Sequence, residues 1–301
     1  MNQAPVRKRW QIVDGVLLLD KPGGLSSNDA LQKARRLFSA AKAGHTGTLD
    51  PMATGLLALC FGEATKFSNR LLEADKTYAA TLRLGVTTTT GDAEGEVLEE
   101  RPVTVDAAVV HAACAGFLGE IEQVPPMYSA LKHQGKALYE YARQGIEIER
   151  ASRRVTIRSL DVTRVGSFEV DIIVRCSKGT YVRTLAEDIG EVLGCGAHLT
   201  ALRRTSIGSL QLADALTLEQ IAAIDEGARR PLLASPDALL AHLPAVQLDM
   251  ETRRLFLHGQ AVRVAAPTGE VRVYGPEFLG LAQTEGDGCI KPVRLIAFPE
   301  V

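Results

Sequence analysis

Strand-like and helix-like patterns follow one another along this chain without regular alternation, and this mixture limits the folds open to it. The apolar run Gly15–Asp20 ends at a Lys-Pro-Gly-Gly turn and leads into a helical pattern at Ala30–Phe38. Thr77–Leu84 and Phe168–Cys176 alternate between apolar and polar residues, as half-buried strands do. Regular strand–helix–strand units would predict a doubly wound parallel sheet. Their absence favours an α+β fold.

Beyond a proline-punctuated, leucine-rich stretch at Pro231–Pro244, the sequence changes character. Short strand patterns now alternate with glycine turns, which is typical of a small β-barrel. We therefore predict two domains, residues 1–243 and residues 244–301, the second with the size of a minor RNA-binding or ligand-binding module. The expected strands of the second domain are 246–248, 261–264, 270–274, 279–283 and 293–297.

Nothing in the sequence predicts a membrane segment or an export signal. The run Val16–Leu19 is far shorter than the about 20 apolar residues of a membrane span. Met1–Trp10 contains the basic cluster Arg7–Arg9 but no apolar stretch long enough for a signal peptide. The five cysteines form no CxxC pair, as expected for free thiols in a reducing compartment. We therefore expect a cytoplasmic protein that does not associate with membranes.

The formal net charge of −2 conceals an uneven distribution. Met1–His45 holds eight Lys and Arg against three Asp and Glu, and Leu131–Leu210 holds thirteen against nine. Gly62–Glu122 between them is acidic, with five against eleven. Basic regions on a nearly neutral chain fit a local anionic partner. Solvated helix faces explain the same charges equally well.

The common cofactor and metal motifs are absent from the sequence. It contains no GxxxxGKS or GxxxxGKT loop, no GxGxxG turn opening a helix, no GxSxG elbow and no HExxH pair. Its six histidines and five cysteines do not have the spacing of a structural zinc site. We therefore expect an enzyme of this sequence to work without a nucleotide cofactor or a metal.

The glycine-rich loop Gly44–Gly55 is the first candidate site. Asp50 precedes Pro51, which pushes the aspartate toward an extended backbone. The glycines allow tight turns and the close approach of a ligand, so the loop presents a carboxylate beside a basic N-terminal region. A turn-capping role for Asp50 is the competing interpretation, and loop chemistry alone favours it.

Two further candidates lie on regular elements. After the turn Ser177–Thr180, Thr180 can cap a helix and place Arg183 in its first turn. A cation there opposes the helix dipole by about 0.3–1 kcal/mol, which a bound carboxylate or phosphate would offset. A solvated surface arginine is the alternative. Tyr78 begins a strand, where a tyrosine is usually half-buried core.

Seven sequence motifs stand in order between residues 15 and 208. They are GVLLLDKPGGLSSNDAL at 15–31, AGHTGTLDPMATGLL at 43–57, GEATKF at 62–67, DKTYAATLRLG at 75–85, QVPPMYSALKHQGKALYEYARQG at 123–145, CSKGTYVRTLAEDIG at 176–190 and GCGAHLTALRRTSIG at 194–208. Together they resemble one family closely, the bacterial tRNA pseudouridine-55 synthases or TruB family. The T-x-T-x-D pattern of that family is present at Thr88, Thr90 and Asp92, within an all-threonine run where relatives often have an acidic residue.

The resemblance implies a fold, a partner and a reaction. The fold is a mixed, largely antiparallel sheet with flanking helices, an RNA-binding insertion at about 123–150 and a PUA-like barrel at 244–301. The partner is the T-arm stem-loop of tRNA, in which uridine 55 is flipped out and isomerised. No redox equivalent or leaving group is exchanged, which agrees with the absence of cofactor and metal motifs. No obligate protein partner is implied, and a monomer suffices.

The resemblance also implies roles for three candidate residues. Asp50 matches the essential aspartate of the family. Attack on ribose C1′ and a route through a glycal, begun by removal of the C2′ proton, both remain open. Arg183 matches the arginine that pairs with this aspartate, and pairing is expected to lower the pKa of Asp50. Tyr78 matches the tyrosine that stacks on the base, and it is a candidate for proton transfer.

The remaining matches surround the base or contact the RNA backbone. Tyr181 matches a pocket residue, and Leu202 matches an apolar residue that covers the uracil. His45 matches a histidine beside the flipped base. Lys21 matches a motif that supports the active-site loop, and direct RNA contact is an equal alternative for this lysine. The residues of the insertion that are expected to meet phosphates are Lys132, Lys136 and Arg143.

Two competing functions remain at this point. A non-catalytic tRNA-binding or tRNA-folding chaperone would tolerate Asp50→Asn, because RNA binding rarely needs a carboxylate near phosphates. A guide-RNA-dependent relative would work inside a ribonucleoprotein. Such chains usually carry extra basic tails, in contrast to the Ile296–Val301 end of this sequence.

Overall fold

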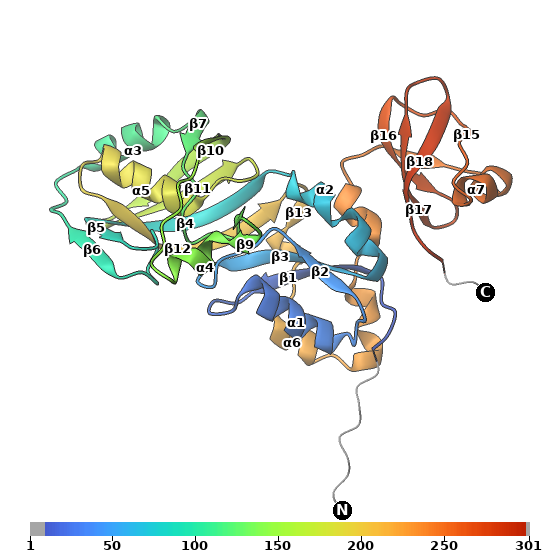
Figure 1. The fold of residues 1–301 in the computed structure, drawn as a ribbon, viewed down its shortest axis with the longest axis horizontal. Coiled ribbons are helices and arrows are strands. Elements are labelled where there is room, and N and C mark those ends of the chain that lie inside the picture. The colour runs from blue at the N-terminus through green and yellow to red at the C-terminus, as the bar shows by residue number, and fades with distance from the viewer. Residues whose placement is uncertain (1–9, 299–301) are drawn as a thin grey trace, which may run out of the picture.

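The computed structural model describes residues 10–298, so the basic cluster Arg7–Arg9 lies outside the described part of the chain. Its main feature is a nine-stranded sheet in the order β1-β3-β12-β4-β11-β10-β7, with β2 paired to β3 and β13 to β12 (Figure 1). β12 runs parallel to β3 and the other pairings are antiparallel. The prediction of a mixed, largely antiparallel α+β sheet is confirmed. The strands are β1 (Gly15–Lys21), β2 (Ala43–Thr46), β3 (Thr54–Phe61), β4 (Lys76–Leu84), β7 (Gly119–Gln123), β10 (Arg153–Val165), β11 (Glu169–Cys176), β12 (Ala197–Ile207) and β13 (Leu210–Gln211).

Helices cover both ends of this sheet (Figure 1). α1 and α6 lie together against β3 and β1, whereas α3 packs on β10 and α5 on β12 and β4. Apolar residues of these helices, such as Leu31, Leu185 and Ile221, share one core with the sheet. The helices are α1 (Ser27–Leu37), α2 (Ser68–Leu72), α3 (Ala107–Ala115), α5 (Val182–Val192) and α6 (Leu218–Ala222), with the 3-10 helices η1 (Gly62–Phe67), η2 (Leu212–Asp214), η3 (Glu226–Ala228), η4 (Arg230–Leu232) and η5 (Pro236–Leu240).

Local capping explains where α1 begins but not where α5 begins. The Ser26 side chain accepts a backbone N–H of the first turn of α1 at 3.1 Å, which makes it the N-cap. The prediction that Thr180 caps α5 is wrong, because Tyr181 is the N-cap and the Thr180 hydroxyl donates to the carbonyl of Ser177. The N–H of Tyr181 donates instead to the side chain of Gln123 on β7, at 3.1 Å. The hydrogen bond at the start of α5 is thus made with a residue of a distant strand and not with Thr180.

The stretch Gly44–Gly55, predicted as a loop, begins within a strand, β2. β2 pairs with β3 from Ala43 opposite Phe61 to Thr46 opposite Ala58. Four residues that include a glycine and a histidine show no alternation long enough to predict a strand. The pairing with β3 is what makes this segment extended.

The C-terminal part of the chain forms a separate curled sheet of the predicted PUA-like, barrel type (Figure 1). Its five strands follow the order β14-β16-β17-β18-β15, and β14 runs parallel to β16. Val271 and Val273 of this sheet and Phe256 of α7 belong to a core of their own. The elements are β14 (Ala245–Gln247), α7 (Met250–Leu257), β15 (Val262–Arg263), β16 (Gly269–Tyr274), β17 (Phe278–Thr284) and β18 (Cys289–Leu295).

A second apolar cluster joins the C-terminal sheet to the rest of the chain. The ring of Phe278 on β17 packs against the ring of Phe67 on η1, with 5.5 Å between the centroids, and Leu240 of η5 lies in the same cluster. Beside it, the ammonium of Lys66 donates to the carbonyl of Leu295 at 3.0 Å. The C-terminal sheet is therefore packed onto the flank of the large sheet through a shared core.

Replacing Phe278 by alanine is expected to loosen both parts of the structure, whereas replacing Phe256 loosens the C-terminal sheet alone. Each change removes a buried phenyl ring at a cost of about 3–5 kcal/mol, but the two rings belong to different clusters. Hydrogen exchange followed by mass spectrometry measures the effect segment by segment. Faster exchange in α2 is expected for Phe278→Ala and not for Phe256→Ala. Changes confined to β14–β18 in both variants would contradict the shared core.

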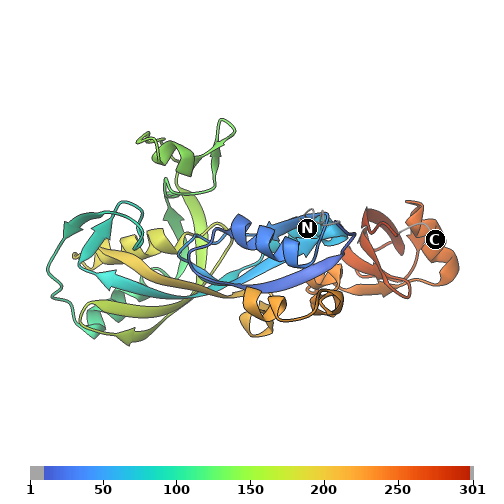
Figure 2. The same ribbon diagram turned by 90° about the horizontal axis from the view of Figure 1, so that it is seen from below.

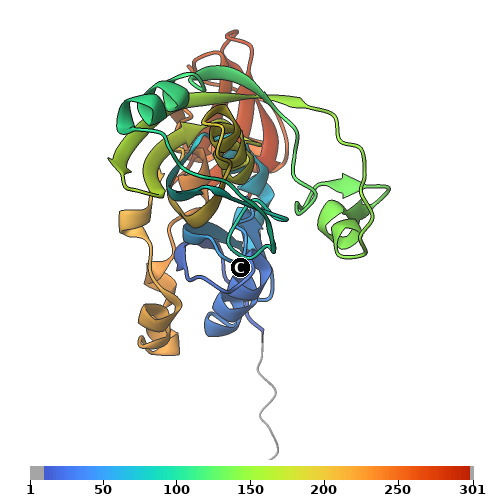
Figure 3. The same ribbon diagram turned by 90° about the vertical axis from the view of Figure 1, so that its left-hand side faces the viewer.

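An arm projects from the large sheet between β7 and β10. We call residues 124–150 the arm; it carries the hairpin β8 (Lys132–His133) and β9 (Lys136–Ala137) and the helix α4 (Leu138–Ala142), and it stands clear of the sheet (Figures 2 and 3). A second hairpin, β5 (Val86–Thr88) and β6 (Val97–Glu100), follows β4. Among the described residues, no helix has the length and apolar character needed to cross a membrane.

Candidate active site

The loop between β2 and β3 brings Asp50 to an arginine from a distant part of the sequence. Oδ2 of Asp50 lies 3.0 Å from Nε of Arg183, in the first turn of α5. The Asp50 side chain is 33% exposed and the Arg183 side chain only 4%. The Asp50 side chain is thus partly buried, while its partner is almost fully buried. The turn-capping interpretation does not describe Asp50, because its side chain is engaged in this ion pair.

Two backbone carbonyls hold the guanidinium of Arg183 in place. Nη1 donates to the carbonyl of Thr90 at 2.9 Å, and Nη2 donates to the carbonyl of Tyr128 at 2.7 Å. Thr90 follows β5 and Tyr128 lies at the base of the arm, so one side chain joins both segments to Asp50. The alternative of a solvated surface arginine is wrong, because the side chain is buried among these partners.

Asp92 is a second carboxylate beside Arg183, and the sequence reasoning gave it no role. Its Oδ2 lies 3.6 Å from Nε of Arg183, and its side chain is 4% exposed. Its Oδ1 accepts hydrogen bonds from the hydroxyl of Thr90 at 2.6 Å and from the N–H of Glu94 at 3.0 Å. The T-x-T-x-D pattern was the sequence signal that could have identified Asp92, because its second threonine, Thr90, hydrogen-bonds this aspartate. Asp92 is therefore buried and held by hydrogen bonds, whereas the Asp50 side chain is one-third exposed.

Burial and pairing act in opposite directions on Asp50. Desolvation raises the pKa of its carboxyl, the Arg183 guanidinium lowers it, and the Asp92 carboxylate raises it again. The net shift is upward. Pairing with Arg183 lowers the pKa of Asp50, as expected, but burial raises this pKa by more than the pairing lowers it. The arginine limits the rise of this pKa.

Lys21 binds the backbone of the segment that carries Asp50. Its side chain is fully buried, and its ammonium donates to the carbonyls of Pro22 at 2.9 Å, Leu25 at 2.6 Å and Pro51 at 3.3 Å. Burial lowers the pKa of Lys21 to about 8, and the Asp50 carboxylate opposes that shift. An ammonium has three N–H bonds, so these carbonyls use all of its donors. The geometry favours loop support over direct RNA contact.

The predicted base contacts Tyr78 and Leu202 lie on adjacent strands. Tyr78 on β4 is 9% exposed and Leu202 on β12 is 8% exposed. In the β12–β4 pairing, Leu202 stands opposite Ala80 and Arg204 stands opposite Tyr78. Burial raises the pKa of Tyr78, so its hydroxyl is protonated at neutral pH.

His45 and Tyr181 come from two other elements. His45 lies on β2, where burial, together with the charge of Arg204, lowers the pKa of its imidazole. Its Nδ1 is buried and has no hydrogen-bond partner among the described residues. Tyr181 ends the turn before α5, and its ring lies 4.8 Å from the guanidinium of Arg153. Because its pKa is lowered, the imidazole of His45 is uncharged at neutral pH.

The three predicted phosphate contacts, Lys132, Lys136 and Arg143, belong to the arm. Lys132 and Arg143 are exposed. The ammonium of Lys136 lies 4.8 Å from the ring of Tyr141, and the guanidinium of Arg143 lies 5.3 Å from the ring of Tyr139. The aromatic rings hold these two cations on the arm.

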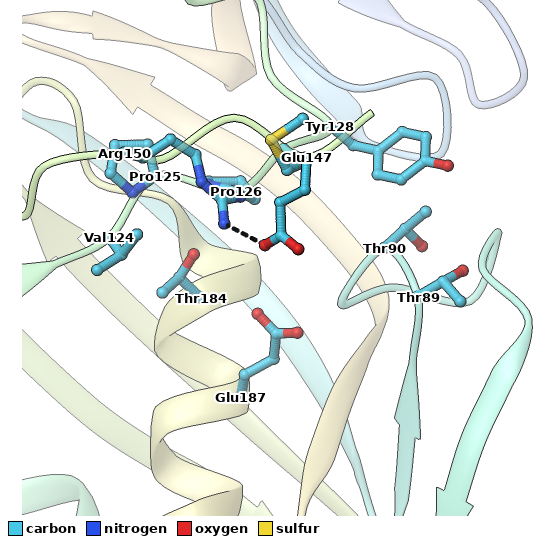
Figure 4. A pocket seen from close by; sticks show the side chains of 11 residues that line it. Thr89, Thr90, Val124, Pro125, Pro126, Tyr128, Glu147, Arg150, Thr184 and Glu187 are labelled. Atoms are coloured by element: carbon cyan, nitrogen blue, oxygen red, sulfur yellow. Dashed lines mark hydrogen bonds and ion pairs between the residues drawn. The ribbon is translucent and has the colours of Figure 1, made fainter. Parts of the chain in front are cut away.

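A cavity of about 340 Å³ lies between the base of the arm, α5 and the loop after β5 (Figure 4). Glu187 points into it from α5, and burial raises the pKa of this carboxyl to about 7. Thr90 and Tyr128 line the cavity. It therefore borders on both residues whose carbonyls bind Arg183.

Three protein-family models match consecutive parts of the chain. Residues 35–182 match the N-terminal domain of TruB family pseudouridylate synthases, residues 183–241 match the tRNA pseudouridylate synthase B C-terminal domain, and residues 244–296 match the C-terminal region of pseudouridine synthase II TruB. A tRNA pseudouridine synthase B of Burkholderia mallei is 60% identical over 300 residues, which cover 96% of each chain. One of Ralstonia nicotianae is 60% identical over 297 residues, which cover 94% of each chain.

Solved structures share the fold. A chain in the crystal structure of a Cbf5-Nop10-Gar1 complex superposes with a TM-score of 0.71 and 25% identity, over 94% of this chain and 85% of that one. A chain of an H/ACA RNP bound to a substrate RNA containing 2′-deoxyuridine superposes with a TM-score of 0.72 and 22% identity, over the same shares of both chains. These likenesses cover the large sheet and the C-terminal sheet together.

Proposed function

The chain belongs to the TruB family of pseudouridylate synthases, and we propose that it isomerises uridine 55 in the T-loop of tRNA to pseudouridine. The observation that carries this proposal is the Asp50–Arg183 ion pair at 3.0 Å, with a partly exposed aspartate and a buried arginine. Relatives that are 60% identical bear the name tRNA pseudouridine synthase B, which supports tRNA as the substrate.

The reaction replaces one bond of ribose C1′ by another. The bond from C1′ to N1 breaks, the uracil turns, and C1′ bonds to C5. The hydrogen on C5 leaves as a proton, and N1 takes up a proton, so the composition of the RNA is unchanged. An ionised Asp50 can attack C1′ or stabilise the positive charge that develops there. A route through a glycal, begun by removal of the C2′ proton, stays open beside it.

The residues around Asp50 are assigned supporting roles. Arg183 fixes the rotamer of the carboxylate and limits its pKa. Tyr78 stacks on the uracil and Leu202 covers it, with Tyr181 at the edge of the pocket. Extruding a stacked base costs a few kcal/mol, and a neutral imidazole of His45 in the vacated space offsets part of this cost.

The arm and the C-terminal sheet are proposed to bind the tRNA around the reacting base. Lys132, Lys136 and Arg143 on the arm would contact phosphates of the T-arm. Residues 244–301 hold six Lys and Arg against seven Asp and Glu, so this part would recognise RNA by shape more than by charge. We propose a cytoplasmic monomer without an obligate protein partner.

Tritium release from tRNA that carries [5-³H]uridine tests the proposed function. Formation of the C1′–C5 bond obliges C5 to lose its hydrogen, so we expect about one equivalent of tritium released per tRNA. A transcript with cytidine at position 55 is the control and should release none above background. Bound tRNA without any release would favour the chaperone function. Equal release from the control transcript would contradict the proposed position.

A further inference from the structure

Among the described residues, Arg204 is the largest side chain that is fully buried, with 1% of its surface exposed. It lies on β12, opposite Gly55 of β3 on one side and opposite Tyr78 of β4 on the other. β12 therefore separates the loop that carries Asp50 from the tyrosine assigned to the base. We call residues 47–55 the Asp50 loop.

Arg204 contacts both ends of the Asp50 loop. Its Nη2 donates to the carbonyl of Gly47 at 3.1 Å, and its Nε donates to the carbonyl of Leu56, just beyond the loop, at 2.8 Å. At Gly55, whose φ is +98°, a Cβ atom would lie 2.4 Å from the carbonyl oxygen of Arg204. Only glycine allows the two backbones to approach this closely. A short loop held at both ends by one residue has little freedom to reorient Asp50.

The same guanidinium reaches the residues assigned to the base. On the adjacent strand β4, Tyr78 stands opposite Arg204, and the charge of Arg204 opposes the rise in the pKa of Tyr78 that burial causes. Burial lowers the pKa of His45, and the charge of Arg204 lowers this pKa further. Within residues 10–298, the guanidinium of Arg204 donates to backbone carbonyls and pairs with no carboxylate, so its charge acts on these neighbours without being neutralised.

We propose that Arg204 is a positioning residue that fixes the Asp50 loop relative to Tyr78. The carboxylate and the ring then meet the target nucleoside at a constant separation. This inference rests on the proposed function. It requires arginine in particular, because a planar guanidinium donates in several fixed directions at once, whereas a lysine ammonium is a compact point charge.

The neighbouring arginine provides a matched control. Arg203 is 42% exposed and pairs with Asp20 at 2.6 Å. It shares the strand and the charge of Arg204, but it donates to the hydroxyl of Thr54 at 3.2 Å and not to the carbonyls of Gly47 and Leu56. Arg203→Lys therefore tests whether any change of arginine at this point of β12 slows the reaction.

The experiment compares the wild type with Arg204→Lys, Arg204→Gln and Arg203→Lys in single-turnover tritium release, tRNA binding and thermal unfolding. Rates are referred to folded protein. We expect the rate to fall by about tenfold for Arg204→Lys and about 100-fold for Arg204→Gln, because a small misplacement of reacting groups has effects of this size. The tRNA dissociation constant should stay within about twofold, and Arg203→Lys should match the wild type within about twofold. A wild-type rate per folded molecule in both Arg204 variants would overturn the positioning role.

A second readout does not depend on activity. The pKa of His45 is measured by NMR on protein with labelled histidine, with His45→Gln to assign the signal. Loss of the charge in Arg204→Gln should raise this pKa, and Arg204→Lys should leave it closer to the wild-type value. A merely space-filling Arg204 would leave it unchanged in both variants, which would overturn the inferred contact. Absence of tritium release by the wild type would instead refute the proposed function, and the NMR result would still decide on the contact.

Discussion

Replacing Asp50 by asparagine is expected to lower the single-turnover rate of tritium release by about 10⁴-fold or more, while tRNA binding stays within a few-fold of the wild type. Losing the group that acts directly on the reacting atoms has effects of about this size in other enzymes. The amide has nearly the shape of the carboxylate but carries no charge, so it can neither attack C1′ nor stabilise positive charge there. Binding should persist because the groups proposed to contact phosphates lie on the arm.

Asp171 offers a matched control for this substitution. Its carboxylate also pairs with an arginine, Arg164 at 2.6 Å, and its side chain is 30% exposed, close to the 33% of Asp50. Asp171→Asn removes an ion pair between two strands of the large sheet, and its rate should stay within about threefold of the wild type. Release by Asp50→Asn above about 1% of the wild-type rate, in protein free of deamidation, would remove Asp50 from the centre of the reaction.

The large sheet could be predicted because some of its strands show a local alternation of apolar and polar residues. Thr77–Leu84 and Phe168–Cys176 alternate clearly, and they form β4 and β11 in the structure. β2 could not be predicted, since four residues carry no pattern and the strand exists through its pairing with β3. The start of α5 was missed for a similar reason, because Gln123 on β7 supplies the hydrogen bond.

Only part of the candidate site could be predicted from the sequence. Loop chemistry alone favoured a turn-capping Asp50, and the resemblance over seven motifs drew attention to its pairing with Arg183. The sign of the pKa shift of Asp50 depends on how deeply the loop is buried, which no local pattern contains. The role of Arg204 could not be predicted either. It follows Arg203, and no local pattern indicates which of the two side chains is buried.

Replacing Arg183 by glutamine is expected to lower turnover by about 10²–10³-fold with only a few-fold change in tRNA affinity. The variant loses the ion pair with Asp50 at 3.0 Å and the donors to the carbonyls of Thr90 and Tyr128. The rotamer of Asp50 and the position of the arm's base then become less defined. The side chain is 4% exposed, so it has little surface with which to hold RNA.

The pH–rate profile shows whether Arg183 acts through the charge of Asp50. Burial raises the pKa of Asp50 and Arg183 lowers it. Removal of the arginine must therefore raise this pKa further, so the acidic limb of the profile should move to higher pH in Arg183→Gln. Arg183→Lys keeps a positive charge and should hold the limb nearer its wild-type place, while the rate stays low because the ammonium cannot reach both carbonyls.

Single-turnover rates between about pH 5 and pH 9 measure this limb, and filter binding at each pH measures affinity separately. Arg164→Gln, which breaks the pair with Asp171 at 2.6 Å, is the control and should leave the limb in place. A limb that stays fixed in Arg183→Gln, or moves to lower pH, would mean that Asp50 is not the group that titrates. A loss of affinity as large as the loss of rate would mean that Arg183 holds RNA rather than orienting the carboxylate.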